Sequence, residues 1–390
     1  MAWPDDTIRG VDLGIEYAKR LHGESEAMIG ALETLVRAET PSEDLAACAA
    51  GADVVSALAE ALLGDPGEAV EVEGRRHLRW RWDPAPGRPS VALLGHYDTV
   101  WPAGTLARWP FQVDEARGTA TGPGCFDMKA GIVQLLHAVA VLDDRSGVEI
   151  LLSCDEELGS QTSRVLIEDL GRRSAAALVF EGSAGGALKI GRKGTGMYRI
   201  GVHGRAAHAG LEPEKGINAL TELAHLLLAV GPVARPEVGT TVTATLAGGG
   251  TASNVVPAEA WMEVDVRVAE PGEADRVDAE ILALRPTVPG ASLSITGGPN
   301  RPPLPVSATA AVYARATAMA ARLGLERLDG VSVGGGSDGN FTAAVGCPTL
   351  DGLGAVGDGA HAEGEWVDLR AMPERAALVA LLIDDLRAQN

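Results

Sequence analysis

Cysteine is scarce in this chain of 390 residues. The four cysteines stand far apart, at positions 48, 125, 154 and 347. They show neither the paired spacing of a zinc finger nor the density of a small disulfide-stabilised scaffold. The sequence therefore predicts neither of these two kinds of domain.

Basic residues are also in short supply. The chain has 33 Lys and Arg against 53 Asp and Glu, which gives a formal charge of −20. Nucleic-acid binders need a basic face, so this class is excluded. No uninterrupted apolar run approaches the roughly 18 residues of a membrane span. The first residues also lack the basic and apolar regions of a secretory signal, so we expect a soluble, cytoplasmic protein.

Two common catalytic motifs are missing. The glycine run 248–250 is not followed by Gly-Lys-Ser/Thr, so it does not resemble a phosphate-binding loop. No Gly-x-Ser-x-Gly elbow occurs, and no cysteine has a matching catalytic signature. Nucleophilic catalysis is therefore not favoured.

Short apolar runs that alternate with helical patterns make up much of the chain. Val91–Leu94, Val148–Ser153 and Ala177–Phe180 are short, largely apolar runs, which is typical of strands buried on both faces of a mostly parallel sheet. Helical patterns precede them in the N-terminal region, where Ser42 is the expected N-cap of a helix that runs towards Leu63. These features predict an α/β domain.

A different pattern occupies residues 194–298. Its predicted elements follow the order β-α-β-β-α-β, and two of the strands alternate polar and apolar residues. This order is typical of a ferredoxin-like sheet with both helices on one face. We therefore predict a catalytic domain formed by residues 1–193 and 299–390, interrupted by an inserted α+β domain at 194–298.

Polar clusters follow the predicted buried strands, and ligands bind at this edge of open α/β sheets. Two histidines with several carboxylates, and no paired cysteines, form a ligand set for a hydrolytic metal centre. Such ligands suit Zn²⁺, with Co²⁺ or Mn²⁺ as alternatives, and a carboxylate can bridge two metals. The residues concerned are His96, Asp98, Asp127, Glu156, Glu157, Glu181 and His361.

The order of these clusters resembles a known family. His-x-Asp, Gly-x-Gly-x-x-Asp-x-Lys-x-Gly, Asp-Glu-Glu, a later Glu and a C-terminal His are similar to the di-zinc metallopeptidases of the bacterial glutamate carboxypeptidase type. That group includes aminoacylases, dipeptidases and succinyl-diaminopimelate desuccinylase. The resemblance covers nearly the whole chain, including the inserted domain.

The resemblance implies a role for each residue of the clusters. Asp127 would bridge two Zn²⁺ ions, His96 and Glu181 would complete one site, and Glu157 and His361 would complete the other. Glu156 would be the general base. Asp98 would fix the imidazole of His96 from outside the ligand shell. In the family, the peptide after the corresponding aspartate is often cis.

The inserted domain resembles the family's lid and dimerisation domain. His208 would reach the active site of a neighbouring subunit in a homodimer and stabilise the oxyanion. Asn254, Arg267 and Arg301 would bind the substrate. Arg267 also has a local explanation, since it shares a strand face with Glu263 and Asp265. Ser337, after Gly334–Gly336, would supply its hydroxyl near the substrate.

These observations predict a zinc-dependent hydrolase that cleaves an amide and releases a free amino acid. The favoured substrate is a small peptide or N-acyl amino acid with a C-terminal or N-acylated glutamate. The alternatives are an aminoacylase or dipeptidase with another side-chain preference, or a catalytically silent metal-binding scaffold. Retention of Glu156 argues against the silent scaffold, because a structural site needs no base.

Overall fold

The computed structural model describes residues 6–325 and 328–388. The chain divides into two compact units. The larger contains Met1–Gly191, Val306–Ser332 and Ser337–Asn390, and the smaller contains Arg192–Pro305 and Val333–Gly336. The predicted insertion at 194–298 falls within the smaller unit, but the sequence did not indicate that residues 333–336 return to it.

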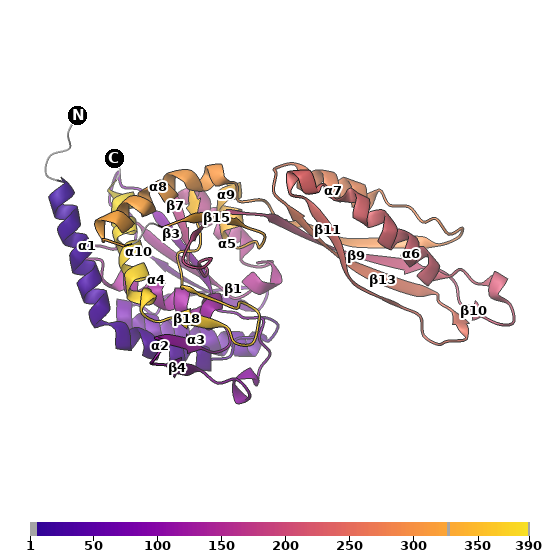
Figure 1. Ribbon diagram of the computed structural model, residues 1–390, viewed down its shortest axis with the longest axis horizontal. Helices are drawn as coiled ribbons and strands as arrows, with labels where there is room; N and C mark the ends of the chain where they lie inside the picture. Colours follow the sequence, from indigo (N-terminus) through magenta and orange to yellow (C-terminus); the bar gives the residue numbers. More distant parts are fainter. Residues whose placement is uncertain (1–5, 326–327, 389–390) are drawn as a thin grey trace. The chain divides into compact units, whose positions relative to one another are not determined.

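A six-stranded sheet forms the centre of the larger unit, in the order β1-β2-β6-β3-β7-β16 (Figure 1). Strand β3 (Val91–His96) pairs in parallel with β6 (Val148–Ser153) and with β7 (Ala176–Val179). The short β16 (Thr349–Leu350) continues the parallel part beside β7. The mixed α/β class predicted from the sequence is therefore confirmed.

Both faces of this sheet are covered, which explains the largely apolar strands. In β3, Val91 and Leu93 pack into the main core, whereas Ala92 and Leu94 pack into a second cluster on the other side. The main core includes residues of α4 (Ala130–Ala140) and α10 (Ala371–Arg387), and the second includes residues of α5 (Arg164–Arg173) and α9 (Gly339–Ala344).

Two antiparallel strands at one edge of the sheet were not predicted. Strand β2 (Arg75–Arg81) pairs antiparallel with β6, and β1 (Glu68–Val72) pairs with β2. Four arginines in β2 mask its apolar pattern, although Leu78 and Trp80 are buried. The sheet is thus parallel in its centre and antiparallel at this edge.

Helix α3 (Leu45–Leu63) begins two residues later than expected. The carboxylate of Asp44 accepts hydrogen bonds from the backbone N–H groups of Ala46 and Ala47 at 3.1 and 3.0 Å, so Asp44 is the N-cap. The prediction of Ser42 was wrong, because its hydroxyl donates to the carbonyl of Thr99 instead.

By length and composition, α3 could also cross a membrane. The helix contains no uninterrupted apolar run of this length, because Asp53 and Glu60 lie within it. One side of the helix, which includes Cys48, Ala52 and Val55, packs into the main core. Core helices commonly combine this length and hydropathy, so α3 is weak support for a membrane span.

The smaller unit is a four-stranded antiparallel sheet in the order β11-β13-β9-β14 (Figure 1). Its chain order is β-α-β-β-α-β, and side chains of both helices share one core with the sheet, as expected for a ferredoxin-like fold. The elements are β9 (Gly194–His203), α6 (Ala219–Val230), β11 (Thr241–Gly249), β13 (Glu259–Val268), α7 (Glu273–Leu282) and β14 (Ser292–Arg301).

The remaining short strands form smaller sheets. A four-stranded antiparallel sheet has the order β17-β18-β5-β4, and two-stranded pairs join β15 to β8 and β10 to β12. The remaining bounds are α1 (Asp6–Gly23), α2 (Ser25–Arg37), β4 (Gln112–Asp114), β5 (Thr119–Thr121), β8 (Leu188–Arg192), β10 (Ala207–His208), β12 (Val255–Val256), α8 (Val306–Arg322), β15 (Gly330–Val333), β17 (Gly357–Asp358) and β18 (Trp366–Asp368).

Candidate metal centre

The candidate ligands of the larger unit lie at the carboxyl ends of its parallel strands. His96 is the last residue of β3, Glu157 follows β6, and Glu181 follows β7. Asp127 lies in the turn Cys125–Lys129 before α4, and the peptide bond from Asp127 to Met128 is cis, as expected. The fifth candidate, His361, lies in the loop between β17 and β18 with a φ of 61°.

Asp127 stands between the two histidines. One of its carboxylate oxygens, Oδ1, lies 3.3 Å from Nε2 of His96, and the other, Oδ2, lies 3.3 Å from Nε2 of His361. Glu181 Oε1 lies 3.5 Å from Nε2 of His96, while Glu157 Oε2 lies 3.1 Å from Nε2 of His361. The side chains therefore form two half-sites that share Asp127.

These separations fit ligands that surround an ion. Two atoms bound tetrahedrally at about 2.0–2.2 Å lie roughly 3.3–3.6 Å apart. His96 Nε2 and Glu157 Oε1 are buried and have no hydrogen-bond partner among the described residues. Because buried polar atoms are costly to leave unpaired, the residues present fit a bound cation.

Electrostatics in the metal-free protein point the same way. Burial by itself lowers the pKa of His96, but the carboxylates of Asp127, Asp98 and Glu181 outweigh it and hold this pKa well above its usual value. Hydrogen bonds to Asp127 and Glu157 raise the pKa of His361 to about 11. Burial raises the pKa of Glu157, although His361 opposes this shift. The raised pKa values of both imidazoles reflect the excess of carboxylate charge that a bound cation would balance.

Asp98 connects His96 to the turn that contains Glu156 and Glu157. Its backbone carbonyl lies 3.0 Å from His96 Nδ1, closer than its carboxylate at 3.4 Å. The two carboxylate oxygens accept the backbone N–H groups of Glu156 and Glu157, each at 3.3 Å. Asp98 is fully buried, so these contacts orient both the imidazole and the following turn.

Glu156 lies close to one half-site. Ligand atoms of Glu156, His96 and Glu181 lie within 4.8 Å of one another. The preceding residue, Asp155, is buried and accepts hydrogen bonds from Thr162 and Ser163. The turn after β6 is thus anchored on both sides of the predicted general base.

The substrate-binding residues predicted in the smaller unit fall into two places. His208 and Asn254 are exposed neighbours, because β10 pairs with β12 and the N–H of Ala209 donates to the carbonyl of Asn254 at 2.9 Å. Arg301 is buried at the end of β14, and Arg267 forms a bidentate pair with Asp265. This unit thus separates His208 and Asn254, at β10 and β12, from the two arginines on β13 and β14.

The hydroxyl of Ser337, which we predicted to lie near the substrate, is part of a buried hydrogen-bond network. This side chain is fully buried and donates to Oδ2 of Asp351 at 2.5 Å. The hydroxyl oxygen of Ser337 also accepts the backbone N–H of Gly339 at 3.1 Å, so Ser337 organises the start of α9. Its partner Asp351 lies 14 residues later in the chain, and no local sequence pattern indicates this pairing.

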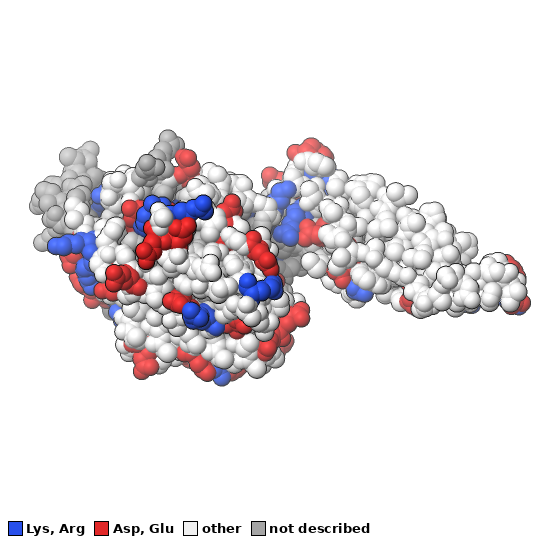
Figure 2. All heavy atoms as spheres, turned by 60° about the horizontal axis from the view of Figure 1, so that its bottom comes forward, with Lys and Arg blue, Asp and Glu red and all other residues white. Residues whose placement is uncertain are grey.

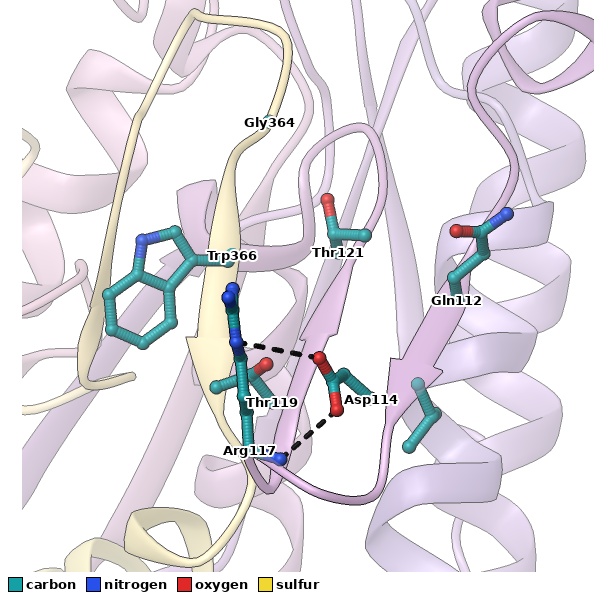
Figure 3. A pocket seen from close by; sticks show the side chains of 8 residues that line it. Gln112, Asp114, Arg117, Thr119, Thr121, Gly364 and Trp366 are labelled. Atoms are coloured by element: carbon teal, nitrogen blue, oxygen red, sulfur yellow. Dashed lines mark hydrogen bonds and ion pairs between the residues drawn. The ribbon is translucent and has the colours of Figure 1, made fainter.

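Two features near the centre were not predicted. Glu365 is fully buried and accepts backbone N–H groups around Asp127. A pocket of about 450 Å³ is lined by residues of β4, β5 and β18 (Figure 3). Trp366 is among its lining residues, but none of the predicted metal ligands is. A glutamate four residues after His361 was the available sequence signal for Glu365.

Two histidines and a cluster of carboxylates, drawn from strand ends and loops of the larger unit, are the kind of ligand set that metal-dependent hydrolases use. Residues 92–385 match the sequence model described as Peptidase family M20/M25/M40, and the chain belongs to this family. It is a metallopeptidase-family hydrolase, and enzymes of this family depend on metal ions.

Relatives with known names agree with this assignment. Carboxypeptidase G2 of Pseudomonas sp. strain RS-16 is 31% identical, over 94% of this chain and 90% of its own. A succinyl-diaminopimelate desuccinylase of Methylorubrum extorquens strain PA1 is 30% identical, over 76% of this chain and 82% of its own.

Solved structures support the fold. An M20 family metallo-carboxypeptidase from Sulfolobus solfataricus has a TM-score of 0.75 at 15% identity, with 93% of this chain and 99% of that chain covered. A tripeptidase from Staphylococcus aureus has a TM-score of 0.72 at 21% identity, with 94% and 99% covered.

Proposed function

We propose that this protein hydrolyses an amide bond and releases a free amino acid, and that its favoured substrates are C-terminal or N-acylated glutamates. One observation carries the proposal: Asp127 lies between the half-site of His96 and Glu181 and that of His361 and Glu157. The similarity to carboxypeptidase G2 over nearly the whole chain supports the release of a C-terminal amino acid.

Two Zn²⁺ ions bound there, with Co²⁺ or Mn²⁺ as alternatives, would polarise the substrate carbonyl and lower the pKa of a bound water. Asp127 would serve as the shared ligand. Glu156 would accept a proton from the attacking water and deliver it to the leaving nitrogen. Asp98 would hold His96 and the Glu156 turn in place through the contacts described above.

Residues of the smaller unit would complete the site. His208 would donate a hydrogen bond to the developing oxyanion of a substrate bound to a partner subunit. Asn254, Arg267 and Arg301 would bind the substrate, and the two arginines suit its free carboxylate. We propose that this unit acts as a lid, which would exclude water from the reacting groups.

The homodimer would form through the same unit. Strand β11 lies at the edge of its sheet, and Leu246 on this strand is 56% exposed. On the neighbouring α6, Leu228 is 79% exposed. Figure 2 shows few charged residues over much of this unit in the face drawn. An open strand edge with exposed leucines suits a second copy of the chain.

An aminoacylase or dipeptidase with another side-chain preference is the second candidate. The relatives named as succinyl-diaminopimelate desuccinylases support this candidate, because family members differ in the amide that they cleave. The four cysteines are all buried and unpaired, which agrees with the cytoplasmic location that we propose.

A substrate panel tests the proposal directly. N-acyl amino acids and dipeptides would be incubated with metal-loaded protein and with chelator-treated protein, and we expect chelator-sensitive hydrolysis that is fastest for glutamate. Fastest hydrolysis of another amino acid would favour the second candidate, and no hydrolysis of any panel member would favour the silent scaffold.

Glu156→Gln tests the general base. The expected loss of kcat is about 10²–10⁴-fold, because the amide cannot accept the proton. Bound metal, measured by elemental analysis, should stay unchanged. Glu115→Gln, at an exposed position, is the matched control and should retain activity. Equal activity of Glu156→Gln and the control would remove Glu156 from the mechanism.

A further inference from the structure

The carboxylate of Glu365 joins two loops that supply candidate metal ligands. It lies four residues after His361 in sequence and directly before β18. Its side chain is fully buried, and its hydrogen bonds reach the turn that contains Asp127, more than two hundred residues earlier in the chain.

Four N–H groups surround this carboxylate. Oε1 accepts the backbone N–H groups of Phe126 and Asp127 at 2.6 and 2.9 Å. Oε2 accepts the backbone N–H of Gly124 and the indole N–H of Trp101, each at 3.1 Å. Two of the four donors therefore belong to the turn that places Asp127, and a third, Gly124, directly precedes it.

The backbone of Glu365 is fixed as well. Its carbonyl accepts the hydroxyl of Thr121, in β5, at 2.7 Å. The strand that follows, β18, pairs with β5 and so continues this attachment. The loop that contains His361 is thus held at its end, and Asp127 and His361 can meet at 3.3 Å.

Only a carboxylate satisfies this arrangement. An ionised carboxylate has two oxygens that accept hydrogen bonds and no donor. A glutamine of the same shape would turn an N–H₂ group towards two of the four N–H donors and leave them without an acceptor. Buried N–H groups without acceptors favour a displaced turn.

We propose that Glu365 is a positioning residue that sets the affinity of the centre for divalent cations. It does so by holding the carboxylate of Asp127 in its position beside the imidazole of His361. This inference rests on the dinuclear centre of the proposed function. Residues that orient metal ligands typically change metal affinity or activity by about 10–100-fold when they are replaced.

The test compares cation binding by metal-free protein, prepared with a chelator, for the wild type, Glu365→Gln and Glu363→Gln. Glu363 lies in the same loop but is 61% exposed and pairs with Arg108, so its replacement is the matched control. Binding of Co²⁺ and Zn²⁺ would be measured by titration, and the visible spectrum of the Co²⁺ form would report ligand geometry.

We expect Glu365→Gln to bind Co²⁺ about 10–100-fold more weakly with an altered spectrum, and Glu363→Gln to match the wild type. Excess cation should restore most of the hydrolysis by Glu365→Gln, which general loss of structure would not allow. Wild-type affinity and spectrum in Glu365→Gln would overturn the inference. The titration needs no substrate, so a failure of the proposed hydrolysis would be seen separately.

Trp101→Phe is the second variant, to be used if Glu365→Gln does not fold. It removes one of the four donors and keeps an aromatic ring beside Trp109. A severalfold weaker Co²⁺ affinity in this variant would support the inference, and an unchanged affinity would contradict it.

Discussion

Asp127 presents its two oxygens to histidines from opposite ends of the chain. His96 ends a buried strand, and its ring is held by Asp98, whereas His361 lies in a loop and is 52% exposed. His96 faces three carboxylates and His361 faces two, which favours the protonated form of both imidazoles. The acid–base behaviour of the centre is therefore a property of these few residues.

Cation binding should depend on pH for this reason. The pKa of His361 is raised to about 11, so this imidazole is protonated near neutral pH in the metal-free protein, and neighbouring carboxylates raise the pKa of His96 in the same direction. A cation must displace these protons, and its apparent affinity should rise about tenfold per pH unit for each imidazolium displaced.

Calorimetry in buffers of different ionisation enthalpy would count the released protons. His361→Ala should release one proton fewer than the wild type, whereas His22→Ala, at an exposed histidine of α1, should release the same number. A cation affinity that does not change between pH 6 and 8 would contradict the predicted protonation states.

At the scale of elements, burial on both faces explains why the central strands could be recognised and the edge could not. Short, largely apolar runs in the sequence indicate β3, β6 and β7. The arginine-rich β2 has no such signal, because its position depends on pairing with β6. The start of α3 was also misjudged, since Ser42 and Asp44 are both good capping residues and only the backbone path selects between them.

Asp44→Ala should destabilise the protein by about 0.5–2 kcal/mol, because two N–H groups at the start of α3 lose their acceptor. The free energy of unfolding, measured with a chemical denaturant, checks this value. Glu43→Ala, one residue earlier and exposed, is the control and should change stability little. A smaller loss for Asp44→Ala than for the control would rule out this cap.

At the scale of the whole molecule, segments far apart in the sequence form the larger unit. Most of the smaller unit is inserted between these segments in the sequence. The order of elements predicted the ferredoxin-like topology, because each strand and helix has its own local pattern. It did not predict that Val333–Gly336 belongs to the smaller unit, since this short segment has no pattern of its own.

The dimer proposal can be tested at this scale. Leu228→Asp places a charge on α6 at a 79% exposed position, and we expect it to weaken self-association at least tenfold without unfolding the chain. Val165→Asp, at a 73% exposed position of α5 in the larger unit, is the control. Sedimentation equilibrium would measure both, and a monomeric wild type would exclude the dimer.

The sequence by itself determined the α/β class, the order of the polar clusters and the family that they resemble, because these depend on local patterns and on residue types. Tertiary structure decided the contacts. It placed Asp127 between His96 and His361, gave the hydroxyl of Ser337 to Asp351, and brought Glu365 to the turn before α4. Such hydrogen bonds join residues far apart in the chain, and only the packed fold brings these residues together.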